Sequence, residues 1–147
     1  MADAVKQATF QSPPGSGSLP GGGTYELWRV FDAELVNGTA TVDSVVHTGN
    51  SVLGFHVAEK HYFGLWINAT SATGTADVTV SILESYNDTA ANYVAPSTGG
   101  TITSALGETA TVYTVTPAPM PRMRFRVVGN AANPTDTVIT AFFWCQG

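Results

Sequence analysis

The chain has 147 residues, 44% of them hydrophobic, which is enough for one domain with a hydrophobic core. Charged residues make up only 12%, and the formal net charge of −5 argues against a nucleic-acid-binding domain, because such domains carry a basic surface. No apolar run approaches the roughly 18 residues that a membrane-spanning helix needs. The first ten residues lack the basic and apolar regions of a secretory signal, so we expect no membrane partner and no secretion.

The first 23 residues have the composition of a linker, with three prolines and five glycines. Ordering such a segment costs about 1–2 kcal/mol per residue in backbone entropy, so an ordered arm needs a neighbouring subunit or another external surface. Its few apolar residues are the expected anchors: Phe10, Leu19 and Pro20. We therefore divide the chain into an extended N-terminal arm, 1–23, and one domain, 24–147.

After residue 23 the sequence consists of short segments rich in β-branched and aromatic residues, separated by turn residues. Eight of these segments are expected strands: 24–36, 39–47, 51–57, 61–70, 75–86, 109–117, 122–129 and 137–145. Asn37-Gly38 favours a hairpin after the first strand, and 87–108 is expected to be an extended loop with a short strand or helical turn. No segment has a helical period. These features predict an all-β fold, a single antiparallel β-sandwich of jelly-roll type.

The sequence contains none of the common catalytic or metal-binding motifs. His56, Glu59 and His61 could be drawn as a metal site, but their spacing matches no standard ligand set, and we expect structural or surface roles for them and for His47. Cys145 lies in an apolar terminal strand, where a thiol is normally part of the core. We therefore predict a protein that is not an enzyme and that uses no metal or cofactor.

Three arginines, Arg122, Arg124 and Arg126, share one face of their strand and account for half of the six Lys and Arg residues. Two interpretations of this stripe stay open. It docks on an acidic partner surface, or it pairs within the chain across neighbouring strands. The carboxylates considered for the internal pairing are those of the first strand: Glu26, Asp32 and Glu34.

The three tryptophans are expected in two environments. Trp66 and Trp144 lie in strongly apolar strands, so we expect both in the core. Trp28 lies among charged residues, and we expect its amphipathic ring at an interface or beneath the arm.

The arm, together with the segments 61–94 and 122–144 ("RMRFRVVGNAANPTDTVITAFFW"), resembles small β-sandwich virion proteins of tailed bacteriophages, especially head-decoration or cement proteins. The resemblance implies a non-enzymatic structural protein that is made in the host cytoplasm and binds the exterior of a capsid. Its implied partners are the major capsid protein and identical subunits, often as a homotrimer.

Two other functions stay open. The chain is a subunit of an extracellular filament whose N-terminal arm adds a strand to the next subunit, or it is a carbohydrate-binding module of a viral fibre. The second alternative requires an exposed aromatic cluster around Trp28, or around Tyr86 and Tyr93.

Overall fold

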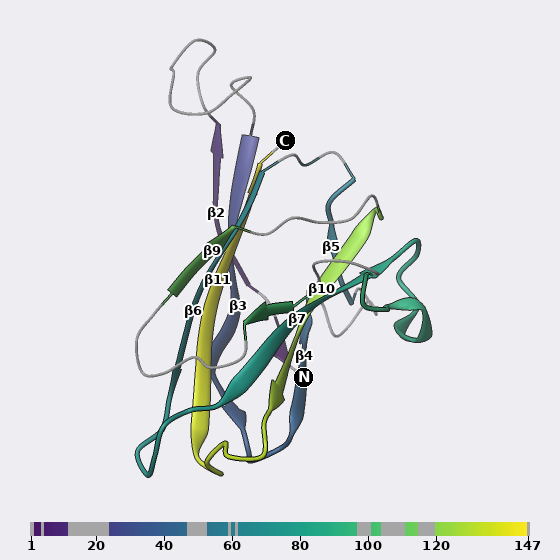
Figure 1. Ribbon diagram of the computed structural model, residues 1–147. Helices are drawn as coiled ribbons and strands as arrows, with labels where there is room; N and C mark the ends of the chain where they lie inside the picture. Colours follow the sequence, from purple (N-terminus) through teal and green to yellow (C-terminus); the bar gives the residue numbers. More distant parts are fainter. Residues whose placement is uncertain are drawn as a thin grey trace.

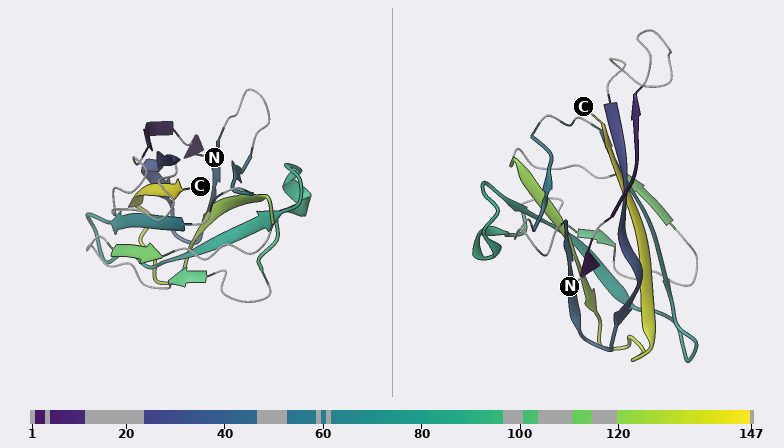
Figure 2. Two further views of the ribbon diagram at one scale, coloured as in Figure 1. Left: turned by 90° about the horizontal axis from the view of Figure 1, so that it is seen from above. Right: turned by 180° about the vertical axis from the view of Figure 1, so that it is seen from behind.

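Two β-sheets pack face to face in the computed structural model, which describes residues 2–3, 5–11, 24–46, 53–58, 60, 62–96, 101–103, 111–114 and 120–146 (Figures 1 and 2). One sheet has the order β1-β4-β10-β7-β8, with β5 also paired to β10, and the other has the order β2-β3-β11-β6-β9. The strands are Ala2–Asp3 (β1), Val5–Gln11 (β2), Thr24–Val36 (β3), Thr41–Val45 (β4), Phe55–His56 (β5), Tyr62–Thr70 (β6), Val78–Ser85 (β7), Thr101–Thr103 (β8), Thr111–Thr114 (β9), Arg122–Gly129 (β10) and Thr137–Gln146 (β11). The β-sandwich prediction is confirmed. Within the described residues no helix is long and apolar enough to cross a membrane.

The strand pairs from β3 to β11 are nested. β3 pairs with β11, β4 with β10, β6 with β9 and β7 with β8, all antiparallel. This part of the chain is therefore one long hairpin of four strand pairs, and the pairs alternate between the two sheets. Such a rolled hairpin is the jelly-roll arrangement that the sequence predicted.

The N-terminal segment contributes one strand to each sheet. β1 pairs with β4 in parallel, and β2 pairs with β3 in antiparallel orientation. For these residues the pairing partner is the chain's own sandwich, not the neighbouring subunit that the expected arm required. Of the expected anchors, Phe10 pairs with Tyr25 through the backbone, while Leu19 and Pro20 lie outside the described residues.

The core lies between the sheets and is rich in phenylalanine. Met123, Phe125 and Val127 alternate along β10 and are fully buried, as the period-two pattern predicted. The Phe143 ring lies at the centre of this cluster, with ring centroids 5.2 Å from Phe125 and 4.9 Å from Phe55. Cys145 is also buried, as predicted.

The turn at Asn37-Gly38 does not make a hairpin, because β3 and β4 belong to different sheets. Gly38 has a φ of +54°, the left-handed conformation that the sequence signal indicated. The buried Asn133 side chain holds the turn, donating to the carbonyl oxygens of Val36 at 3.0 Å and Gly38 at 2.8 Å. A turn signal fixes the local backbone but does not select which strands pair.

Trp66 and Trp144 were expected in the core, but both are only partly buried and lie on the outward face of the five-stranded sheet. Trp66 packs on Phe142 at 5.7 Å between ring centroids, and Trp144 covers Gly64. β11 lies in the middle of its sheet and is apolar on both faces. That pattern identifies a central strand without showing which of its faces the second sheet covers.

Candidate interaction surface

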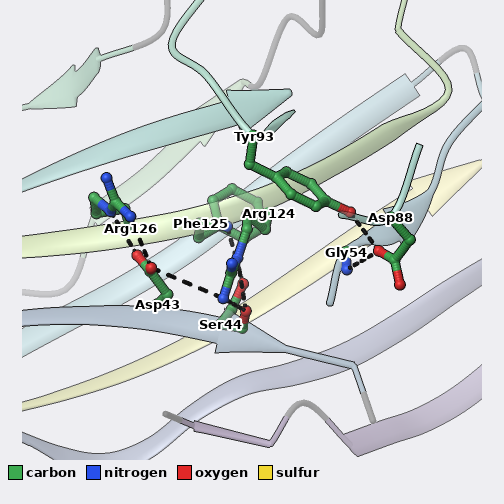
Figure 3. Close-up of polar contacts among 8 residues, drawn as sticks. All are labelled: Asp43, Ser44, Gly54, Asp88, Tyr93, Arg124, Phe125 and Arg126. Atoms are coloured by element: carbon green, nitrogen blue, oxygen red, sulfur yellow. Dashed lines mark hydrogen bonds and ion pairs between the residues drawn. The ribbon is translucent and has the colours of Figure 1, made fainter. Parts of the chain in front are cut away.

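The three arginines of β10 have different environments, and Figure 3 shows two of them, Arg124 and Arg126. Arg124 is 3% exposed and donates from Nε and Nη2 to the Ser44 carbonyl oxygen, at 3.1 and 2.9 Å. Arg126 is partly exposed and binds Asp43 in a bidentate pair, with N···O distances of 2.6 and 2.8 Å. Arg122 is partly buried and makes no ion pair within the described part of the chain. Of the three arginines expected to dock on an acidic partner, only Arg122 and the exposed part of the Arg126 side chain are therefore accessible.

The internal partners of the stripe come from β4. The sequence had pointed to carboxylates of β3, which the structure places in the other sheet: Glu26, Asp32 and Glu34. Asp32 pairs instead with Arg29 at 3.4 Å. Spacing along a strand shows which side chains share a face, but it does not show which strand lies beside them.

Asp43 lies between the guanidinium groups of Arg126 and Arg124, the latter at 3.9 Å from its Oδ2 (Figure 3). Burial alone would raise the pKa of Asp43. The hydrogen bonds from Arg126 and the charges of both arginines outweigh burial and lower it. Ser44 adds a bond, since its Oγ accepts from the Phe125 N–H at 2.9 Å. These side chains fasten β4 to β10.

A second network fastens the connection that follows β7. The Asp88 carboxylate accepts hydrogen bonds from the Tyr93 hydroxyl at 2.6 Å and from the N–H groups of Leu53 at 2.8 Å and Gly54 at 3.1 Å. The Tyr93 ring lies over the guanidinium of Arg124, 5.4 Å from its centroid, so the two networks touch (Figure 3). No pattern in the sequence predicted this site, because Asp88 lies in a segment without periodicity and its backbone partners Leu53 and Gly54 are 35 and 34 residues away.

Burial and the hydrogen bond between Tyr93 and Asp88 shift the pKa values of both groups. Burial raises the pKa of Tyr93, and the hydrogen bond to Asp88 raises it further. For Asp88, burial acts to raise the pKa, but the donors from Tyr93, Leu53 and Gly54 outweigh it and lower the value. At neutral pH the pair is a phenol donating to a carboxylate.

Gly54 is the position where the backbone comes closest to Tyr93. A Cβ at Gly54 would overlap the Tyr93 hydroxyl and would lie 2.8 Å from the carbonyl oxygen of Met123. Glycine is therefore needed here for a close approach. Tyr93 is itself buried, so it cannot be the exposed aromatic of a sugar-binding cluster.

Three exposed hydrophobic side chains lie in the segments that follow β7 and precede β10. Tyr86, which follows β7, is 66% exposed; Val94, which follows the 3-10 turn, is 60% exposed; and Met120, which precedes β10, is 44% exposed. Among the described residues just one other large hydrophobic side chain is exposed, Leu35 at 52% on β3. The sequence analysis did not single out Val94 or Met120, because isolated apolar residues in irregular segments carry no pattern.

The remaining predicted site residues do not assemble into a site. Trp28 is partly buried: its ring packs edge-on against Phe55 at 5.2 Å, and its Nε1 donates to Glu26 at 3.2 Å, so these contacts are internal. Of the histidine group, His56 is exposed and pairs with Arg122 across β5 and β10. His47, Glu59 and His61 lie outside the described residues. The described part of the chain contains no cluster of three or more His, Cys, Asp or Glu residues able to hold a metal.

No protein-family model matches the chain, and no curated protein matches it. A solved structure that is similar to it is a Podospora anserina GH26-CBM35 β-(1,4)-mannanase, with a TM-score of 0.43 and 11% sequence identity. The match covers 99% of this chain and 26% of the mannanase chain, so this protein spans about a quarter of the length of that one.

Proposed function

We propose that the chain is a non-enzymatic structural protein of a virion that binds the outer surface of a capsid as a decoration. The observation that carries the proposal is the position of the exposed hydrophobic side chains, three of which lie in the segments that follow β7 and precede β10. Exposed apolar patches on an otherwise closed domain mark surfaces that bind other proteins. The capsid as partner comes from the resemblance of the sequence to head-decoration proteins.

The use of the acidic groups also supports a structural role. Asp43, Asp88 and Asp136 all have a lowered pKa, and each accepts several hydrogen bonds that join separate parts of the chain. Asp136, for example, accepts from the hydroxyls of Ser71 at 2.6 Å and Thr73 at 2.7 Å, joining the connection after β6 to that before β11. A carboxylate that is fully hydrogen-bonded and already ionised makes a poor general base at neutral pH.

The test uses particles of the virus that encodes the chain, prepared without this protein. We expect such particles to assemble but to rupture at a lower temperature than complete ones, and the added chain to bind them and restore their stability. An oligomer, a homotrimer in the proteins that the sequence resembles, gains affinity because its linked subunits contact a repeating lattice. Particles that are equally stable without the protein and do not bind it would overturn the proposal.

A second candidate function is carbohydrate binding, and a specific observation favours it. Trp66, Phe142 and Trp144 lie on the outward face of the five-stranded sheet and are all partly exposed. Aromatic rings on a sheet surface offer faces for stacking. If this is the function, the chain is retained by affinity gels containing soluble polysaccharides, and W66A and W144A abolish the retention.

The filament alternative requires β2 to pair with the next subunit. In the structure β2 occupies the edge of its own β3. A filament would therefore form only if β2 left its own β3 and paired with the β3 of the next subunit. Electron microscopy of the purified chain shows whether it forms filaments.

A further inference from the structure

We propose that the outward face of β6 is a binding site for an uncharged, extended glycan. The rings of Trp144 and Trp66 stack on successive sugar residues, and the Asn68 amide bonds to a sugar hydroxyl. This inference rests on carbohydrate binding, the second candidate function, and gives that function a site and a class of ligand. It does not depend on the capsid proposal.

The Trp144 ring is positioned by a glycine on the neighbouring strand. Trp144 of β11 pairs with Gly64 of β6, and its indole ring lies over that glycine. A Cβ at Gly64 would overlap Nε1 of the ring and would lie 2.6 Å from Cε2 and 2.9 Å from Cδ1. The ring therefore occupies the outward position of Gly64, which has no side chain of its own.

Three successive outward positions of β6 therefore carry a ring, a second ring and an amide. Gly64, Trp66 and Asn68 are two residues apart, and the residues between them belong to the core. Two residues of a strand span about 7 Å, so this row is about 14 Å long. Trp66 packs on Phe142 of β11, at 5.7 Å between ring centroids, which supports the second ring from the side. Figure 1 shows β6 and β11 running side by side, and a straight row along them fits an extended chain of sugar rings.

The amide at the end of the row has hydrogen-bonding capacity that the chain does not use. Asn68 is partly exposed, but its Oδ1 atom is buried and has no hydrogen-bond partner. Buried polar atoms in proteins are nearly always bonded, so an unpartnered one indicates a contact that is still to be made. A half-turn of the amide exchanges its acceptor with its donors. A sugar hydroxyl both donates and accepts, so it satisfies either orientation.

The composition of this face selects an uncharged ligand of small width. The outward positions of β6 from 64 to 70 and of β11 from 138 to 144 carry no charged residue. Arg29, which pairs with Phe142 from β3, already has Asp32 as its ion-pair partner. A nucleic acid or an anionic membrane would need basic side chains here. A stable protein interface covers about 800 Å² on each partner, far more than a row about 14 Å long and roughly one strand spacing, 5 Å, wide. A glycan needs neither, because its C–H faces contact rings and its hydroxyls bond to an amide.

The experiment is affinity gel electrophoresis of the purified chain, with one soluble polysaccharide in each gel. Hydroxyethyl cellulose, galactomannan and pullulan are the uncharged probes, and alginate is the anionic one. The test variants are Gly64→Ala, which keeps every ring but displaces that of Trp144, and Asn68→Ala. The matched controls are Gly74→Ala, at an exposed glycine, and Asn92→Ala, at a partly exposed asparagine of the 3-10 turn.

We expect an uncharged polysaccharide to retain the wild-type chain equally well at low and high salt, since no charge takes part. Each test variant weakens this retention about tenfold, the effect of losing one stacking or hydrogen-bonding contact. The two controls are retained like the wild type.

Thermal melting of each variant separates loss of the site from loss of the fold. Should Gly64→Ala fail to fold, Asn68→Ala carries the test, because its side chain makes no bond through Oδ1 that the fold could lose. Retention that the folded test variants keep overturns this inference and leaves carbohydrate binding intact, and retention by alginate alone overturns the uncharged ligand. A wild-type chain that no polysaccharide retains overturns carbohydrate binding itself. Self-association that Trp144→Ala abolishes, measured by sedimentation velocity, would assign the face to a second copy of the chain and also overturn the inference.

Discussion

Asp88 shows how much of this fold depends on single polar side chains. Its carboxylate is partly exposed, yet it accepts three hydrogen bonds from two separate segments. Removing it leaves the N–H groups of Leu53 and Gly54 and the Tyr93 hydroxyl without their acceptor. Unpaired groups that are partly or fully buried cost about 1–3 kcal/mol.

We therefore expect Asp88→Ala to lower the free energy of unfolding by about 1–3 kcal/mol at pH 7. The folded-state pKa lies below the ordinary value of 3.8, so this stabilisation is complete above about pH 4. It is lost as the pH falls through the folded-state pKa. Urea titrations at pH 7 and at pH 3 measure the difference between variant and wild type, which shrinks in acid. Asp32→Ala, at an exposed pair with Arg29, is the control; an equal loss there would contradict this account.

Gly54 is restricted by space, because a Cβ there meets the Tyr93 hydroxyl. We expect Gly54→Ala to destabilise the fold by about 1–3 kcal/mol, the usual cost of overpacking. Tyr93→Phe removes the hydroxyl oxygen, so the same glycine substitution costs less in that background, although the carbonyl oxygen of Met123 still lies close. Denaturant unfolding of the two single variants and the double variant measures this coupling. Equal costs in both backgrounds would show that the hydroxyl is not the obstacle.

At the scale of one strand, β10 combines a fully buried face with a face of graded burial. Its bounds, Arg122–Gly129, are those predicted, because its alternation of arginine with apolar residues is complete. The fate of the arginines was not predictable in the same way. It depends on β4, whose Asp43 and Ser44 lie about 80 residues earlier, and on the Tyr93 ring.

Glutamine substitutions along β10 test this gradient. We expect Arg124→Gln to cost about 2–4 kcal/mol, because it removes charge-assisted hydrogen bonds from a buried site. Arg126→Gln costs about 1 kcal/mol, since its pair with Asp43 is partly exposed to solvent. Arg122→Gln stays within about 0.5 kcal/mol of the wild type. The urea midpoints of the three variants rank their losses of unfolding free energy. A loss for Arg122→Gln as large as that for Arg124→Gln would mean that Arg122 is also a structural residue.

Three strands, β2, β6 and β11, show where the sequence patterns were insufficient. The prolines and glycines of 12–23 dominated the composition of the N-terminal segment, so the strand Val5–Gln11 was not recognised. Trp66 and Trp144 were predicted in the core because β6 and β11 are apolar on both faces. In each case the structure of the segment depends on a contact with another strand, and the sequence of the segment itself does not indicate that contact.

At the scale of the whole molecule, the nested pairing determines which strands lie at the edges of the two sheets. Without the N-terminal strands, β3 and β4 would each lie at the edge of a sheet. β2 covers the edge of β3, and β1 covers the edge of β4. Uncovered edges are sites of pairing with other chains. The first eleven residues therefore decide whether one side of the sandwich is available for association.

Deletion of residues 2–11 is the corresponding prediction. The rolled hairpin from β3 to β11 keeps its core, so we expect the truncated chain to fold but to melt at a lower temperature. It also associates in a concentration-dependent way through the edges of β3 and β4, which thermal melts and sedimentation velocity measure. A peptide of residues 1–11 restores the melting temperature and the monomer by refilling these edges, whereas a scrambled peptide does neither. An unchanged melting temperature would show that the N-terminal strands do not stabilise the sandwich.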